Sequence, residues 1–265
     1  MEEEFYNSKI NPIALLLASL AYCYYLATYI PKGFSRVTFI FPVFYIFYIF
    51  PWNFHSSLLR GIFSFFITWI TSFKLLLFSF DQGSLFACEN YLDFVLVSVF
   101  PIKIKEDNPS KTLKYELVQL FNKPYFATSL QDFWGRRWNR LSSNILRQTI
   151  YNPTQDFLKG ILGIKAAKIL SLIITLVVSG IMHELMFYYI TCGKKPTWEV
   201  TKFFVLQGIC IVCEVCLKYW FRVRVKSWKR FDSKGANILT MGFILITCYW
   251  GLVLPVWRSG QNKCT

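Results

Sequence analysis

Six stretches of the chain are apolar over enough residues to cross a lipid bilayer, and this feature limits the possible folds more than any other. They are Pro12–Ile30, Val37–Trp52, Gly61–Phe80, Ile169–Ile190, Val200–Phe221 and Ala236–Trp257. A helix needs about 20 residues to cross ~30 Å of hydrocarbon. Because an open strand leaves its backbone groups unsatisfied in lipid, we predict that all six stretches are helices. The predicted fold is all-α: a polytopic integral membrane helix bundle with an additional cytosolic or interfacial helical segment.

The composition supports this fold and excludes a soluble protein that binds nucleic acid. The formal net charge is +14, yet only 17% of the residues are charged, 54% are hydrophobic and the mean hydropathy is +0.38. A soluble nucleic-acid-binding domain with this net charge would carry many more charged residues. We therefore expect membrane lipids around the chain and no nucleic acid among its partners.

The basic residues divide unequally between the two sides that six crossings create. Residues 31–36, 81–168 and 222–234 share one side and hold 20 of the 29 Lys and Arg residues. The positive-inside rule places this side in the cytosol and the acidic N-terminus on the other side. The cytosolic surplus could meet anionic lipid head groups or a phosphorylated substrate, and the charge alone favours neither partner.

Three cysteines in the fifth span have a spacing that superficially resembles an iron–sulfur motif. Cys210, Cys213 and Cys216 lie inside an apolar stretch and spread around a helix, whereas a cluster needs its ligands to converge. We interpret them as small packing residues and expect no metal site.

The fourth span carries an imidazole on a polar face of its helix. Thr175, Ser179 and His183 recur every four residues and therefore share one face. Ionisable residues inside spans are rare, and a neutral imidazole can act as the general base for a hydroxyl. Gly180 is expected to leave a gap beside His183 that suits a substrate channel, while Glu184 is expected to face another helix. The alternative is an interhelical hydrogen bond that only stabilises the bundle.

A sequence rich in tryptophan and arginine precedes this span on the predicted cytosolic side. It reads Ser129-Leu-Gln-Asp-Phe-Trp-Gly-Arg-Arg-Trp-Asn139, and the spacing of its first serine and aspartate is typical of a helix N-terminus. Three polar residues of the helix that follows are predicted to share one face: Asp132, Arg136 and Asn139. Trp134 and Trp138 are predicted to form a neighbouring aromatic stripe. The helix could bind substrate, with Asn139 orienting a carbonyl or hydroxyl and the arginines neutralising phosphate, or it could only lie at the membrane interface.

These two sequences resemble the plant wax synthase-like group of the membrane-bound O-acyltransferases. The tryptophan-rich sequence is followed, as in that group, by an apolar helix that carries Ser179-Gly-Ile-Met-His183-Glu184. Three other sequences add to the resemblance: Phe73-Lys-Leu-Leu-Leu-Phe-Ser-Phe-Asp-Gln-Gly83, Asn122-Lys-Pro-Tyr-Phe-Ala-Thr-Ser129 and Tyr151-Asn-Pro153. The similarity covers nearly the whole chain.

The resemblance implies one domain over residues 1–265 and an integral membrane enzyme of the endoplasmic reticulum. Such an enzyme transfers an acyl group from acyl-CoA, its co-substrate, to a lipid alcohol and forms a wax ester, sterol ester or acylglycerol without a cofactor or metal. Asn139 and His183 match the paired catalytic residues of the group. Further residues are predicted to bind substrate: Asp132, Trp134, Arg136, Arg137, Trp138 and Ser179. The resemblance predicts no oligomeric state.

The chain departs from the pattern of the group at one point. Members of the group carry a further pair of apolar segments where this chain passes from Pro101 to Leu120 without a span, so a helix pair is expected to be missing near residues 105–115. Two alternatives to an active enzyme follow. The chain could be a catalytically inactive, shortened membrane scaffold of the same family, or a small transporter whose polar stripe around His183 lines a solute path.

Overall fold

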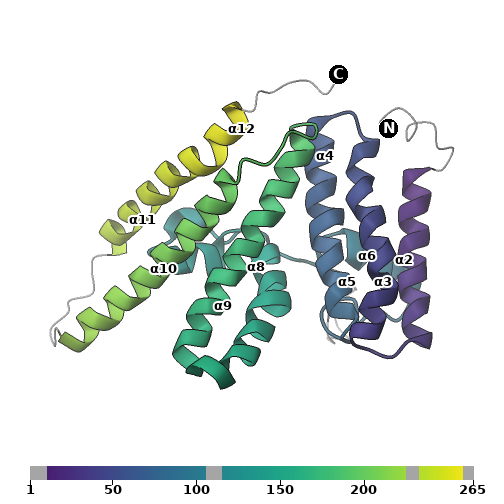
Figure 1. The fold of residues 1–265 in the computed structure, drawn as a ribbon, viewed down its shortest axis with the longest axis horizontal. Coiled ribbons are helices and arrows are strands. Elements are labelled where there is room, and N and C mark those ends of the chain that lie inside the picture. The colour runs from purple at the N-terminus through teal and green to yellow at the C-terminus, as the bar shows by residue number, and fades with distance from the viewer. Residues whose placement is uncertain (1–10, 106–114, 225–232, 259–265) are drawn as a thin grey trace. The chain divides into compact units, whose positions relative to one another are not determined.

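The computed structural model describes residues 11–105, 115–224 and 233–258, with the side chains of 221–224 and 233–234 left out. Most of these residues lie in helices, as predicted (Figure 1). The chain divides into two units, residues 1–118 with 262–265 and residues 119–261.

Among the described residues, six helical segments are long and apolar enough to cross a membrane, in agreement with the six predicted spans. They are Pro12–Tyr29, Phe34–Asn53, Ser57–Phe78, Arg140–Ile190, Glu199–Trp220 and Gly235–Arg258. Pro42 lies inside the second segment without ending it. The fourth segment begins far before the predicted Ile169.

The first unit consists of helices joined by short turns. In chain order they are α2 (Pro12–Tyr29), α3 (Phe34–Ile49), η1 (Phe50–Asn53), α4 (Ser57–Phe63), η2 (Ser64–Thr71), α5 (Ser72–Phe78) and α6 (Tyr91–Val99). The strands β1 (Ile102–Ile104) and β2 (Tyr115–Leu117) then pair antiparallel, with Ile102 opposite Leu117. Asn11 caps α2, because its Oδ1 accepts a hydrogen bond from the backbone N–H of Ile13 at 2.9 Å.

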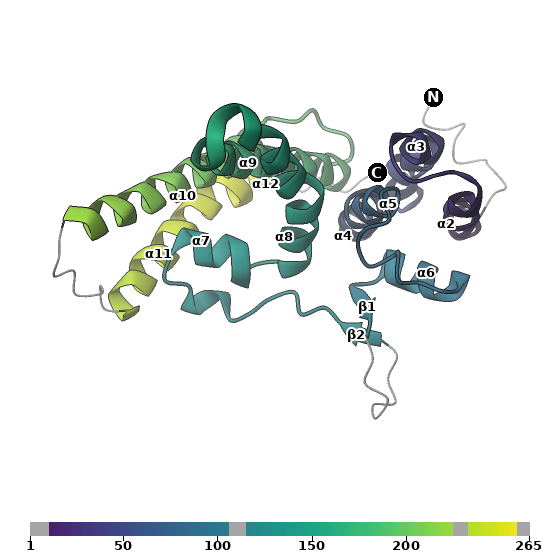
Figure 2. The same ribbon diagram turned by 90° about the horizontal axis from the view of Figure 1, so that it is seen from below.

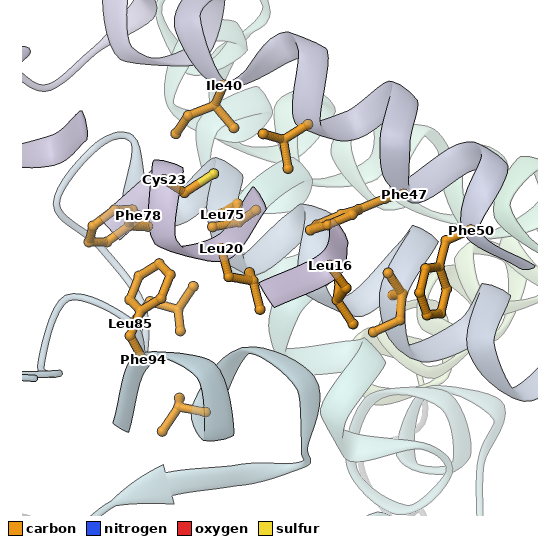
Figure 3. Close-up of a cluster of buried hydrophobic side chains, with 13 residues drawn as sticks. Leu16, Leu20, Cys23, Ile40, Phe47, Phe50, Leu75, Phe78, Leu85 and Phe94 are labelled. Carbon is orange, nitrogen blue, oxygen red and sulfur yellow. The ribbon is translucent and has the colours of Figure 1, made fainter. Parts of the chain in front are cut away.

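Apolar side chains from several of these helices form the core of the first unit. Figure 3 shows this cluster, in which Leu20, Ile40, Phe47, Leu75 and Phe94 are fully buried. They come from α2, α3, α5 and α6. The cluster therefore joins helices that the sequence separates by up to about 70 residues.

Two buried cations join elements of the first unit through hydrogen bonds. Arg36 donates to the carboxylate of Asp81 at 2.7 Å and to the carbonyl of Phe78 at 3.0 Å. Lys74 donates to the carbonyl of Val97 at 2.5 Å, near the end of α6, where unsatisfied carbonyls attract a cation. Lys74 and Asp81 belong to the 73–83 sequence that resembles the acyltransferase group, and here they join helices of the first unit.

The second unit begins with short helices and continues with long ones. In chain order they are η3 (Pro124–Phe126), α7 (Leu130–Asp132), η4 (Phe133–Arg137), α8 (Arg140–Leu146), η5 (Arg147–Tyr151), α9 (Asn152–Ile190), α10 (Glu199–Arg224), α11 (Ser233–Cys248), η6 (Tyr249–Val253) and α12 (Leu254–Arg258). The elements η4, η5 and η6 are π-helical.

The helix α9 is interrupted at Gly163, which explains why its segment is longer than the predicted span. Gly163 has φ 77° and ψ 163°, a conformation that glycine adopts at little cost. Figure 1 shows the helix that starts with α8 and the later part of α9 running as two neighbouring helices. The predicted span at Ile169 therefore starts shortly after a break that separates it from the more polar helix before it.

Glycines allow α9, α10 and η6 to approach closely. A Cβ atom at Gly180 would lie 2.8 Å from Cα of Thr201, and one at Gly251 would lie 2.6 Å from Cβ of Phe203. A Cβ at Gly208 would lie 2.9 Å from a methyl carbon of Leu176. Contacts between small residues and a neighbouring helix are typical of membrane bundles.

Candidate active site

The tryptophan-rich sequence folds as two short helices rather than one. Ser129 caps the first helix as predicted, since its Oγ accepts a hydrogen bond from the N–H of Asp132 at 3.0 Å. The helix ends after Arg137, and Asn139 has the left-handed values φ 37° and ψ 63°. The prediction that Asp132, Arg136 and Asn139 share one helix face is therefore wrong. Asparagine tolerates this conformation because its short side chain can bond to the nearby backbone.

Asn139 is the N-cap of α8. Its Oδ1 accepts a hydrogen bond from the backbone N–H of Ser142 at 3.2 Å, and its carbonyl accepts one from the N–H of Ser143 at 3.0 Å. The side-chain oxygen of Asn139 is thus occupied by the cap of α8. The two hydrogens of the Nδ2 amide are the donors that this cap does not use, and donors of this kind stabilise an oxyanion.

Asp132 and Arg137 bind each other. Nε of Arg137 lies 2.5 Å from a carboxylate oxygen of Asp132, across a π-helical turn that places residues five apart together. Arg137 also donates to the carbonyls of Asn122 and Lys123 at 3.4 and 3.2 Å. This pair joins the motif to the preceding Asn122–Ser129 sequence, so a structural role accounts for both residues. Arg136 is exposed, and its role as a phosphate ligand stays a prediction.

Trp134 attaches the motif to α10. Its indole N–H donates to Oε1 of Gln207 at 3.2 Å, and its ring contacts that of Phe204 with centroids 5.6 Å apart. Gln207 is fully buried and donates in turn to Oγ1 of Thr247 on α11 at 2.9 Å. Figure 2 shows α7 on the α10–α11 side of this unit.

Trp138 takes a different position from Trp134. It is 41% exposed and stacks on Phe133 with a centroid distance of 5.4 Å and an interplanar angle of 16°. Its ring also meets the edge of Phe121 at 5.1 Å. The two tryptophans therefore do not form one stripe: Trp134 packs inward, and Trp138 covers the outer side of the motif.

His183 receives its orientation from its own helix. Its Nδ1 lies 2.7 Å from the carbonyl oxygen of Ser179, one turn earlier in α9. A carbonyl can only accept, so Nδ1 carries the hydrogen and Nε2 carries the lone pair of the neutral ring. Ser179 thus contributes its backbone, while the hydroxyl of Thr175 bonds to the carbonyl of Ser171 at 2.6 Å.

The neighbours of His183 in α9 fix this turn against α10. Oε1 of Glu184 accepts hydrogen bonds from the N–H groups of Val200 and Thr201 at 3.1 and 3.2 Å. The prediction that Glu184 faces another helix is confirmed. The predicted gap at Gly180 is wrong, because the backbone of Thr201 fills that space.

Phe204 of α10 brings the two predicted catalytic regions together. Its ring lies 4.4 Å from the imidazole of His183, with an interplanar angle of 32°, and it also contacts Trp134 of the motif. The predicted motif and the predicted base therefore pack on the same side chain.

Several residues that build this site were not predicted. Gln207 and Phe204 contact the predicted residues directly, and Glu214 accepts a hydrogen bond from the N–H of Leu130 at 2.9 Å. Asn237 of α11 donates to the carbonyls of Tyr125 and Ala127. Polar side chains inside apolar spans were the available signal for Gln207 and Glu214.

Within the three described ranges, no cluster of three or more His, Cys, Asp and Glu side chains is suited to a metal ion. The candidate residues of this region are a base (His183), an amide donor (Asn139), an exposed guanidinium (Arg136) and the aromatic rings of Trp134 and Phe204. This set can take a proton from a hydroxyl, stabilise an oxyanion and bind phosphate.

Comparisons with known proteins agree with this chemistry. The model of the membrane bound O-acyl transferase family matches residues 117–206, a range that contains Asn139 and His183. The chain is 34% identical to acyl-CoA–sterol O-acyltransferase 1 of Arabidopsis thaliana over 97% of this chain and 91% of the relative. It is 33% identical to the probable long-chain-alcohol O-fatty-acyltransferase 9 of the same plant, over 99% of this chain and 94% of the relative.

A third relative, the probable long-chain-alcohol O-fatty-acyltransferase 3 of Arabidopsis thaliana, is 32% identical over 98% of this chain and 92% of its own length. No solved structure matches the chain at a significant level. Identity at this level over nearly the full length of several relatives establishes common descent, and the chain belongs to the plant wax synthase-like group of the membrane-bound O-acyltransferase family.

Proposed function

We propose that this chain transfers an acyl group from acyl-CoA to the hydroxyl of a hydrophobic alcohol and so forms a neutral lipid ester. The observation that carries the proposal is the near-full-length similarity to relatives named as sterol and long-chain-alcohol acyltransferases. The contacts of Phe204 with both His183 and Trp134 support it, because they bring the base and the motif of Asn139 to one region of the second unit.

In the proposed reaction, Nε2 of His183 takes the proton of the alcohol. The alcohol oxygen attacks the carbonyl carbon of the thioester, and a C–O bond forms while the carbonyl oxygen becomes negative. The Nδ2 hydrogens of Asn139 stabilise this oxyanion. The C–S bond then breaks, the CoA sulfur leaves, and the imidazolium returns its proton to that sulfur. The products are an ester and free CoA.

Exposed basic residues within and beside the motif are the proposed ligands of the CoA phosphates. Arg136 and Lys123 are exposed, and Arg147 donates to the carbonyl of Gly135 at 3.4 Å beside them. Guanidinium groups suit phosphate because they can donate two parallel hydrogen bonds. We propose that this region faces the cytosol at the endoplasmic reticulum membrane. The basic residues would then have access to acyl-CoA.

The acceptor is proposed to be a sterol or a fatty alcohol, as in the names of the relatives, or a diacylglycerol. All three present one hydroxyl at the end of an apolar body, which matches a base inside an apolar span. Trp138, at the outer side of the motif, is a candidate contact for the donor.

The shortened length favours a second candidate, an inactive scaffold. The alignment with the sterol acyltransferase runs over 326 positions and uses 97% of 265 residues, about 257, so about 69 positions have no residue of this chain opposite them. We propose that a helix pair near 105–115 accounts for them; residues 106–114 lie outside the described part. The paired strands β1 and β2 would carry such an insertion, because antiparallel strands leave and return side by side.

Microsomes that contain the chain test the proposal when they receive labelled acyl-CoA and a panel of alcohols. The expected result is a labelled ester that falls by about 100-fold or more in His183→Ala, the typical effect of losing a general base. His55→Ala is the matched control, since His55 is the other histidine of the chain. Ester formation that persists in His183→Ala would refute the mechanism. No ester at normal expression would favour the scaffold, and solute flux without ester would favour the transporter.

A further inference from the structure

Two neighbouring phenylalanines of α10 have similar burial but different contacts. Phe203 is 4% exposed and Phe204 is 2% exposed. Adjacent residues of a helix point about 100° apart. Both rings contact that of Trp134, at 6.1 Å for Phe203 and 5.6 Å for Phe204. Phe203 otherwise packs against Gly251, whereas Phe204 lies 4.4 Å from the ring of His183.

The position of Phe204 is fixed on both sides along α10. Three residues earlier, Thr201 is held by the carboxylate of Glu184 and by the close approach of Gly180. Three residues later, the fully buried Gln207 bonds to Trp134 and Thr247. The first turns of α10 therefore contact α9, the motif and α11. Phe204 lies between the two residues that make these contacts, Thr201 and Gln207.

The imidazole of His183 is in contact with the ring of Phe204. Its hydrogen bond to the carbonyl of Ser179 fixes the tautomer. An aromatic ring at 4.4 Å and 32° covers one face of the imidazole and restricts its tilt. The direction of Nε2 therefore depends on Phe204 as well as on Ser179.

We propose that Phe204 is a positioning residue for the acyl transfer: its ring holds the imidazole of His183 in the plane in which Nε2 meets the acceptor hydroxyl. This inference rests on the proposed function. It makes α10 part of the catalytic unit, beside the two sequences that resemble the family. Because Trp134 packs on the ring of Phe204 as well, a movement of the motif would also shift the imidazole of His183.

Kinetics of matched variants test the proposal in active membranes. Phe204→Leu is expected to lower kcat about 10- to 100-fold, the effect of misplacing a reacting group by about 1 Å, while the KM values for both substrates change less than about twofold. Phe204→Tyr keeps the ring and should retain most of kcat. Phe203→Leu removes equally buried apolar area and should cost less than about threefold in kcat. Equal losses in Phe203→Leu and Phe204→Leu, or a changed KM with an unchanged kcat, would overturn the proposal.

Chemical labelling gives a second readout that does not require ester formation. Diethylpyrocarbonate modifies imidazole, and the chain has two histidines, so His55 serves as the internal reference for His183. Phe204→Leu should raise the labelling of His183 relative to His55 by about threefold or more, because the smaller side chain lets the imidazole tilt and exposes its reactive nitrogen. Phe203→Leu should leave the ratio unchanged. Equal ratios in all forms would refute the contact, whereas a raised ratio without any ester would support the contact and refute the proposed activity.

Discussion

The carboxylate of Glu184 caps α10 by accepting the backbone N–H of Val200 at 3.1 Å. The same oxygen accepts the N–H of Thr201, and Glu184 is buried. Because Glu184 follows His183 directly in α9, this cap joins the turn of the base to the helix that carries Phe204. The orientation of the site thus depends on a bond that lies outside the predicted catalytic pair.

Glu184→Ala is expected to destabilise the protein by about 2–3 kcal/mol, since two backbone N–H groups lose their acceptor in a buried place. Glu184→Gln keeps a carbonyl oxygen and should lose less than about half of that. Glu199→Ala is the control at the start of the same helix, where the side chain is half-exposed. Thermal unfolding in detergent measures the three effects, and equal midpoints for Glu184→Ala and Glu199→Ala would contradict the role of the cap.

Gly180→Ala should also destabilise the protein, because the new Cβ would lie 2.8 Å from the backbone of Thr201 and the helices would have to separate. We expect a loss of about 1–3 kcal/mol, as for overpacking of a core. Gly242→Ala on α11 is the matched control, since a Cβ there meets nothing within 4 Å and alanine favours a helix. The unfolding midpoint should fall in the first variant and stay or rise in the second; the reverse order would contradict the packing of α9 on α10.

Asn139→Asp separates folding from catalysis at the cap of α8. The carboxylate can still accept the N–H of Ser142, so the unfolding midpoint should change little. The amide donors are lost, and kcat should fall about 100- to 1,000-fold, as for the removal of one oxyanion donor. Asn139→Ala should lose both stability and activity. An Asn139→Asp form with normal kcat would show that the donors of Asn139 do not act on the substrate.

The two arginines of the motif should respond differently to substitution. Arg136→Gln removes an exposed charge and should raise the KM for acyl-CoA about tenfold, the effect of one charge-assisted hydrogen bond, without loss of stability. Arg137→Gln breaks the pair with Asp132 and should lower the unfolding midpoint. An acyl-pantetheine donor, which lacks the nucleotide phosphates, should make Arg136→Gln and the unaltered chain equal. A persistent difference with this donor would exclude phosphate binding by Arg136.

Hydropathy predicted the six spans because the cost of exposing polar backbone in lipid acts on each segment separately. Local spacing also predicted the cap at Ser129, which depends on residues three apart. The left-handed turn at Asn139 escaped prediction, because residues 129–139 have a continuous helical pattern and nothing in the spacing ends it. Gly163 was equally ambiguous, since a glycine in an apolar sequence can continue a helix or break it.

The site itself depends on contacts between distant residues. The bond from Trp134 to Gln207 joins positions 73 apart, and periodicity carries no information about such a pair. Gln207 could have been singled out, because a polar amide in an apolar span requires partners. At Gly180 the sequence suggested a gap that does not exist. A glycine on a membrane helix is as suitable for close packing as for an open space.

Acyl transfer by the purified full chain in lipid vesicles tests the role of His183 as the base. Labelled acyl-CoA is supplied with a sterol or a fatty alcohol, and the unaltered chain is compared with His183→Ala and His55→Ala. We expect ester formation with at least one acceptor, retained in His55→Ala and reduced about 100-fold or more in His183→Ala. Ester formation that is equal in all three proteins, or that is absent from a well-folded unaltered chain, would contradict this expectation.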